Sequence, residues 1–162
     1  MRRMSRRRLK RVIDADRIRD AIEKAEAETS GEIRVSVAPF FWGSVHRAAR
    51  GAFSRLGMTR TKERNGVLIF VVPSRRRFVV LGDEGIHNHV GQDFWEGVAQ
   101  AMSSKFREAD FTGGLIHGIE ETGRRLKTHF PHRADDVDEL PDDVDFTGGK
   151  PTASGDSGDE DT

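Results

Sequence analysis

The chain has 162 residues with 27 basic side chains, 27 acidic side chains and no cysteine, so it is long enough for one domain with its own core and cannot form a disulfide. The zero net charge is a cancellation, because residues 1–11 contain seven bases and no acid, whereas residues 135–162 contain eleven acids and one base. No apolar run approaches the roughly 18 residues of a membrane span, and no apolar stretch follows the basic start as it would in a secretory signal. We therefore expect a soluble cytoplasmic protein.

The first half of the chain predicts a helix, a strand and a second helix. Apolar residues at helical spacing predict a helix over 14–29, which Asp14 or Asp16 can cap. Alternating apolar and polar residues predict a half-exposed strand over 32–38. Residues 44–57 carry apolar side chains at i, i+3 and i+4 throughout and predict the clearest helix.

The second half predicts a hairpin followed by two helices. The continuous apolar run 67–72 is typical of a central strand buried on both faces. Residues 77–82 return after a Pro-Ser turn and predict the antiparallel partner of that strand. Apolar stripes then predict helices over 90–107 and 112–128.

This order of elements predicts an α/β fold with helices on both faces of a small mixed sheet. A further short strand is expected at one of two places, 40–42 or 86–90. We expect residues 12–133 to form the domain. The basic head, 1–11, and the acidic tail, 134–162, contain too few apolar residues to offset their ordering entropy, so we expect both to be disordered.

Acidic residues at predicted strand ends and connections are candidate metal ligands. Glu32 begins the first strand, Asp83 ends the hairpin and Asp110 lies between the last two helices. Carboxylates without a cysteine ligand suit a hard cation such as Ca²⁺ or Mg²⁺. The alternative is local, since Asp110 can cap the following helix and Asp83 can fix the turn over 82–85.

Other chemical signals are weaker. The sequence contains no Cys nucleophile, no Gly-x-Ser-x-Gly elbow and no Gly-x-x-x-x-Gly-Lys phosphate loop. His87 and His89 can share a metal such as Zn²⁺ only if a loop turns both toward it, and His129 and His132 form a second spaced pair. The Arg-rich residues 1–11 can bind phosphates of nucleic acid or acidic lipid, or serve only as a solubilising start.

A set of short motifs in fixed order resembles the TPM domain family, named after a thylakoid-lumen protein, a photosystem II repair protein and a worm receptor modulator. The resemblance runs from about residue 16 to 131. Its motifs lie at 30–35, 56–58, 64–69, 77–80, 82–86, 94–95, 110–111, 113–115 and 118–119.

The resemblance implies an α/β/α sandwich with a small central sheet and an acidic site near one end of that sheet. The acidic positions that match are Glu32, Asp83 and Asp110, with Glu84 beside them, and Asn65 falls in the turn before the central strand. Members of the family are reported to bind calcium or other divalent ions, and one plant member is described as an acid phosphatase.

Three hypotheses follow. The preferred one is a divalent-cation-binding or protein-interaction module, with Ca²⁺ or Mg²⁺ as the ion, an unknown protein partner and no proven catalysis. The rival is a metal-assisted acid phosphatase acting on phosphate monoesters, in which Asp83 or Asp110 is the nucleophile or a metal ligand and Arg76 clamps the phosphate. The third is a nucleic-acid-associated protein that uses residues 1–11.

Overall fold

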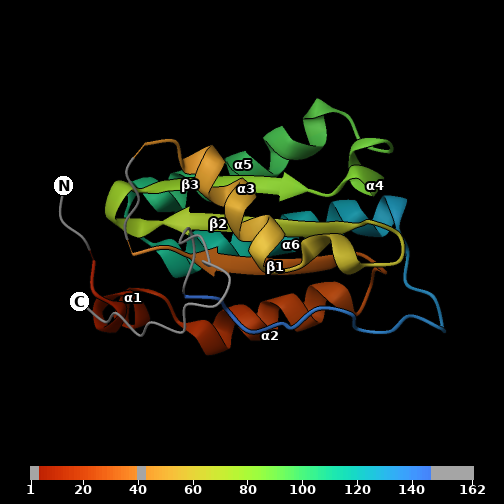
Figure 1. The fold of residues 1–162 in the computed structure, drawn as a ribbon, viewed down its shortest axis with the longest axis horizontal. Coiled ribbons are helices and arrows are strands. Elements are labelled where there is room, and N and C mark those ends of the chain that lie inside the picture. Colours follow the sequence, from red (N-terminus) through yellow and green to blue (C-terminus); the bar gives the residue numbers. More distant parts are fainter. Residues whose placement is uncertain (1–3, 40–42, 147–162) are drawn as a thin grey trace.

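The structure is a computed structural model that describes residues 4–39 and 43–146 (Figure 1). Its helices and strands are α1 (Arg6–Val12), α2 (Ala15–Glu26), β1 (Glu32–Val37), α3 (Val45–Arg55), β2 (Gly66–Val72), β3 (Arg77–Gly82), α4 (Glu84–His87), α5 (Gln92–Arg107) and α6 (Phe111–His129). Single 3₁₀ turns occupy Met58–Arg60 and Pro73–Arg75. The strand considered at 86–90 is wrong, because Ile86 lies in α4, and the alternative at 40–42 lies outside the described residues.

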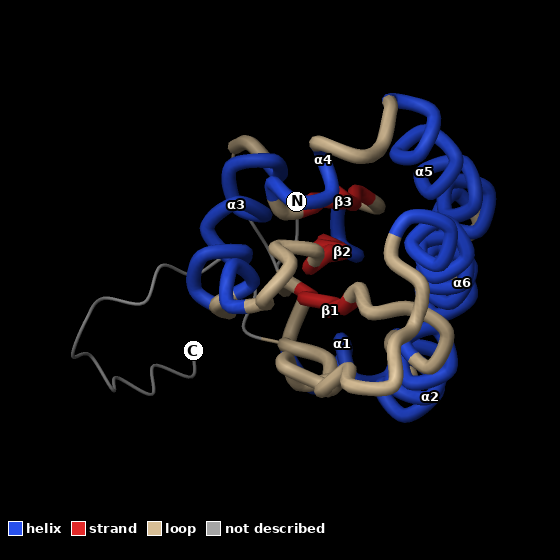
Figure 2. Tube along the Cα trace, turned by 90° about the vertical axis from the view of Figure 1, so that its right-hand side faces the viewer, coloured by secondary structure: helices blue, strands red, loops and turns tan. Residues whose placement is uncertain are grey.

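The sheet has three strands in the order β1-β2-β3. β1 pairs with β2 in parallel, and β2 pairs with β3 antiparallel, so the sheet is mixed. Helix α3 covers one face, and α2, α5 and α6 cover the other (Figure 2). This arrangement confirms the predicted three-layer α/β/α sandwich.

The central strand β2 is buried at every position, as its apolar run predicted. Its side chains alternate between two clusters. Val67, Ile69 and Val71 join the core beneath α2, α5 and α6. Leu68, Phe70 and Val72 join the core beneath α3. A strand buried on both faces needs no polar positions, which explains its continuous apolar sequence.

Capping residues set the starts of the predicted helices. The Asp14 side chain accepts a hydrogen bond from the Arg17 amide at the start of α2. The Ser44 side chain does the same for Arg47 at the start of α3. Gly57, which follows α3, has a φ of 66°, a left-handed conformation that glycine adopts without strain. Local sequence therefore determines where these helices begin and end.

Both ends of the chain differ from the expectation of disorder. Residues 6–12 form α1, in which Leu9 is completely buried in the main core. After α6, residues 138–146, which we call the strap, run beside β1, and Leu140 is only 6% exposed. Each segment contributes one buried leucine to the core, although its composition is strongly charged. Residues 147–162 lie outside the described part of the chain.

The described helices also bear on membrane insertion. Within residues 4–39 and 43–146, no helix combines the length and the apolar character that crossing a bilayer requires.

Candidate metal centre

Three acidic residues converge beside the first residue of β1. Glu26 ends α2, Glu32 begins β1 and Asp138 belongs to the strap. One oxygen atom from each carboxylate lies within 4.8 Å of the others, and no second group of this kind occurs in the described residues. A fourth acid, Asp142, is within hydrogen-bonding reach of Glu26.

Backbone amides hold two of these carboxylates in place. Glu26 Oε2 accepts a hydrogen bond from the Ile33 amide at 2.8 Å. Glu32 Oε1 accepts two, from the amides of Glu139 at 2.6 Å and Leu140 at 2.8 Å. These bonds join α2, β1 and the strap around a cavity of about 390 Å³ that all four carboxylates line.

The carboxylates have unusual protonation equilibria. Burial raises the pKa of Glu32 to about 7, and the neighbouring Asp138 contributes to the rise. Burial also raises the pKa of Glu26 to about 10, with Asp142 as the second cause. The pKa of Asp138 is raised by its own partial burial. The low-dielectric surroundings and the like charges both disfavour the ionised form.

Two oxygen atoms in this cluster lack a donor. Glu32 is only 4% exposed, and its Oε2 is buried with no hydrogen-bond partner; the same holds for Oδ1 of Asp142. A carboxylate oxygen only accepts hydrogen bonds, so two facing carboxylates need either a shared proton or a cation between them. The cluster is therefore suited to hold either a shared proton or a cation.

Asp83 and Glu84 lie elsewhere along the same end of the sheet and bind an arginine instead. Asp83 is 4% exposed and makes a bidentate ion pair with Arg64, with distances of 2.6 and 2.9 Å. Its Oδ1 also caps α4. Glu84 contacts Arg64 at 3.1 Å. The buried Asn65 donates to the Glu63 carboxylate at 3.1 Å and so supports the preceding turn.

Asp110 and Arg76 lie at the opposite end of the sheet. Asp110 caps α6 by accepting from the Gly113 amide at 2.9 Å. Arg76 follows the end of β2 and donates to the Arg107 carbonyl at 3.4 Å. Since Asp83 adjoins the start of β2, the two acids of the phosphatase hypothesis lie at opposite ends and share no site.

The histidines of the two spaced pairs contact aromatic rings or an acid. The His87 ring lies 5.4 Å from that of Trp95, and the His89 ring lies 5.6 Å from that of Phe130. His129 approaches Phe94 at 6.5 Å. His132 contacts Asp136 at 3.3 Å and lines the same cavity as the carboxylate cluster.

Sequence reasoning found only Glu32 among the four clustered acids. One signal for Glu26 was present, because Ile18, Ile22 and Glu26 lie at i, i+4 and i+8 and therefore share the buried face of α2. An acid on an apolar stripe indicates a special environment. Asp138 and Asp142 carried no such signal, since they lie among many acids of the tail.

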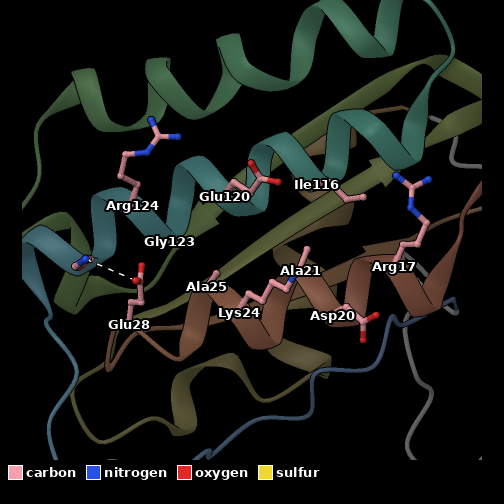
Figure 3. A pocket seen from close by; sticks show the side chains of 11 residues that line it. Arg17, Asp20, Ala21, Lys24, Ala25, Glu28, Ile116, Glu120, Gly123 and Arg124 are labelled. Atoms are coloured by element: carbon pink, nitrogen blue, oxygen red, sulfur yellow. Dashed lines mark ion pairs between the residues drawn. The ribbon is translucent and has the colours of Figure 1, made fainter.

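A larger cavity of about 540 Å³ lies between α2 and α6 (Figure 3). Ala25 and Gly123 bring the two helices close together, since a Cβ on Gly123 would lie 2.7 Å from that of Ala25. Its rim carries charges of both signs, including the Lys127–Glu28 ion pair at 3.8 Å. This groove does not include the carboxylate cluster.

Comparison with known proteins agrees with the fold. The model of the TPM domain family matches residues 10–125. The NMR structure of BA42 protein from the psychrophilic bacterium Bizionia argentinensis is 41% identical, with a TM-score of 0.78 over 82% of this chain and 92% of that one. The N-terminal domain of cg2496 protein from Corynebacterium glutamicum shares the fold at 15% identity, with a TM-score of 0.57 over 76% of this chain and 77% of that one.

No functionally curated protein matches. Because the family model covers most of the chain and BA42 is similar over nearly its whole length, this chain belongs to the TPM domain family.

Proposed function

We propose that this TPM domain binds a divalent cation, Ca²⁺ or Mg²⁺, at Glu26, Glu32, Asp138 and Asp142. The observation that carries the proposal is the buried Glu32 Oε2, which has no hydrogen-bond donor, in a side chain that lines one cavity with the three other carboxylates. Oxygen-only ligands favour a hard cation. An ion there would satisfy the orphan oxygen and remove the repulsion between like charges.

The ion would also hold the tail on the domain. Glu26 and Glu32 belong to α2 and β1, whereas Asp138 and Asp142 belong to the strap. Binding one ion to both sets of ligands joins segments that are more than 100 residues apart in sequence. The cation is therefore a structural clip in this proposal, and no turnover is required of it.

Thermal unfolding of the full chain tests the proposal. An ion that binds only the folded state stabilises it by about 1.4 kcal/mol at tenfold excess over Kd. For a chain of this size that is a rise in Tm of about 3–6 °C. We expect such a rise in millimolar Ca²⁺ or Mg²⁺ at pH 8. Glu32→Gln should abolish it, because the amide keeps the acceptor for Glu139 and Leu140 but removes the charge.

Glu32→Gln should also raise the Tm in the absence of ions, since it removes one of the repelling charges. The matched control is Asp135→Asn, which removes one exposed charge just before the strap and should keep the full ion response. An equal ion response in wild type, Glu32→Gln and Asp135→Asn would mean diffuse attraction to the acidic tail and would contradict the site.

A further inference from the structure

The edge of β1 is covered by an extended acidic segment of the same chain. β1 is an edge strand, since β2 is its only partner in the sheet of the described residues. The strap runs parallel to it. The Val37 amide donates to the Asp145 carbonyl at 2.7 Å, and the Asp145 amide donates to the Val35 carbonyl at 2.9 Å. If the strap leaves, the unpaired N–H and C=O groups of this edge can pair with another extended segment.

Two side chains of the strap fit specific positions on the domain. Leu140 is buried in the cluster beneath α3, beside Met58. Five residues later, the Asp145 carboxylate accepts from Ser36 Oγ at 2.7 Å and from Arg55 Nη2 at 2.7 Å. The ion pair with Arg55 is largely buried, with side-chain exposures of 14% and 9%. The Leu140 pocket and the Ser36–Arg55 pair together select a leucine that is followed five residues later by an aspartate.

The strap leaves one donor of this surface unused. Arg34 lies on the same face of β1 as Ser36, and its Nε is buried with no hydrogen-bond partner in the described residues. The nearby Asp143 instead contacts the exposed Arg19 at 3.4 Å. A segment that presents an additional acceptor to Arg34 would therefore make a bond that the strap does not make.

The strap lies at the edge of the domain and is attached to it at a few positions. In the described residues its only strand pairing is an isolated β-bridge, and its main buried contacts are those of Leu140 and Asp145. The segment that leads to it, residues 131–135, is exposed. At its start, Asp138 and Asp142 lie beside the acidic side chains of Glu32 and Glu26 and line one cavity with them. A segment at the edge of a domain that is held by a limited number of contacts opens locally at a lower free energy than global unfolding.

We propose that the β1 edge, with the Leu140 pocket, Ser36, Arg34 and Arg55, is a peptide-binding site for a partner protein. The partner supplies an extended acidic segment with a leucine five residues before an aspartate, and the segment adds to β1 as a parallel strand. The strap is the intramolecular occupant that blocks the site until it is displaced.

A fluorescent peptide of residues 137–146, added to the full chain in EDTA, tests this directly. In the Asp145→Lys chain, the strap meets Arg55 with like charge and is released, so the peptide should bind at least tenfold more tightly than to wild type. Adding Arg55→Glu to that chain restores opposite charges between positions 55 and 145, which closes the strap. It also repels the Asp145 carboxylate of the peptide, so binding should fall to the wild-type level or below it.

Release of the strap is verified by faster hydrogen exchange at the Val37 amide. If Asp145→Lys does not fold, Leu140→Ser releases the strap by another route. A folded chain with a released strap that fails to bind the peptide, or that binds a scrambled peptide equally well, overturns the proposal. Repeating the titration in Ca²⁺ separates the two proposals, since the peptide site requires no ion, whereas tighter binding in Ca²⁺ reports on the carboxylate cluster.

Discussion

Glu32 and Asp83 have the same exposure, 4%, at the same end of the sheet, yet their surroundings are opposite in charge. Asp83 faces the guanidinium of Arg64, whereas Glu32 faces the carboxylate of Asp138. Sequence position alone does not distinguish them, since each lies at the end of a strand. The folded structure places a different partner beside each carboxylate. Of the two, only Glu32 has an oxygen without a hydrogen-bond donor.

This difference predicts separate phenotypes. Asp83→Asn should leave the response of the Tm to Ca²⁺ unchanged, because Asp83 lies outside the cluster. Arg64→Ala should lower the Tm, because the buried Asp83 carboxylate then loses its ion-pair partner. Arg60→Ala, which removes an exposed arginine nearby, serves as the control. Loss of the ion response in Asp83→Asn would instead place Asp83 in the metal site.

At the scale of elements, the strongly periodic helices and the apolar strand were predictable, and the two terminal segments were not. Helix α3 has five apolar residues at helical spacing and strand β2 has six apolar residues in a row, so local sequence suffices for both. Helix α1 offers one fully buried side chain, Leu9, in a run of bases. The strap has isolated apolar residues without period. Both are stabilised by tertiary contacts, which composition does not report.

The contribution of α1 can be measured through its single buried leucine. Leu9→Ala should destabilise the chain by about 2–5 kcal/mol, the usual cost of truncating a buried leucine. Arg8→Ala, at the neighbouring exposed position, should change stability by about 0.5 kcal/mol or less. Chemical denaturation of the two variants supplies both values. A small effect of Leu9→Ala would show that α1 is only loosely attached and that the domain begins near residue 12.

For the whole molecule, the sheet has two chemically different ends. The amino ends of β1 and β2 carry the buried acids and meet the strap. The carboxyl ends meet a cavity lined by Arg8 and Arg76. The candidate site could not be predicted as a whole, because Glu26 and Asp138 are more than 100 residues apart in sequence and meet only when α6 returns the chain to β1. The candidate site therefore includes residues of the strap that lie beyond 10–125, the part of the chain that the family model matches.

The raised pKa values make stability depend on pH in a direction opposite to that of most carboxylates. Glu32 has a pKa of about 7 in the folded chain against 4.5 as the ordinary value, and Glu26 has about 10. At pH values between the ordinary pKa and the folded-state pKa of each group, the folded state binds more protons than the unfolded state. The slope of the unfolding free energy against pH is proportional to the number of protons bound in the unfolded state minus the number bound in the folded state. That difference is negative here, so stability falls as pH rises. The contribution is complete below about pH 4.5 and is lost as pH rises through the folded value.

We therefore predict that, without divalent ions, the Tm of the full chain falls as pH rises from 5 to 8, because the pKa values of both Glu26 and Glu32 are raised in the folded state. A cation replaces the protons, so Ca²⁺ should raise the Tm little at pH 5 and most at pH 8, which flattens the profile. Glu32→Gln should make the profile shallower without any ion, while Glu26 keeps the remaining slope. His132 lines the same cavity, so His132→Gln is the control and should keep the falling profile. A Tm that rises between pH 5 and 8 in wild type without ions would show that the cluster neither shares protons nor awaits a cation.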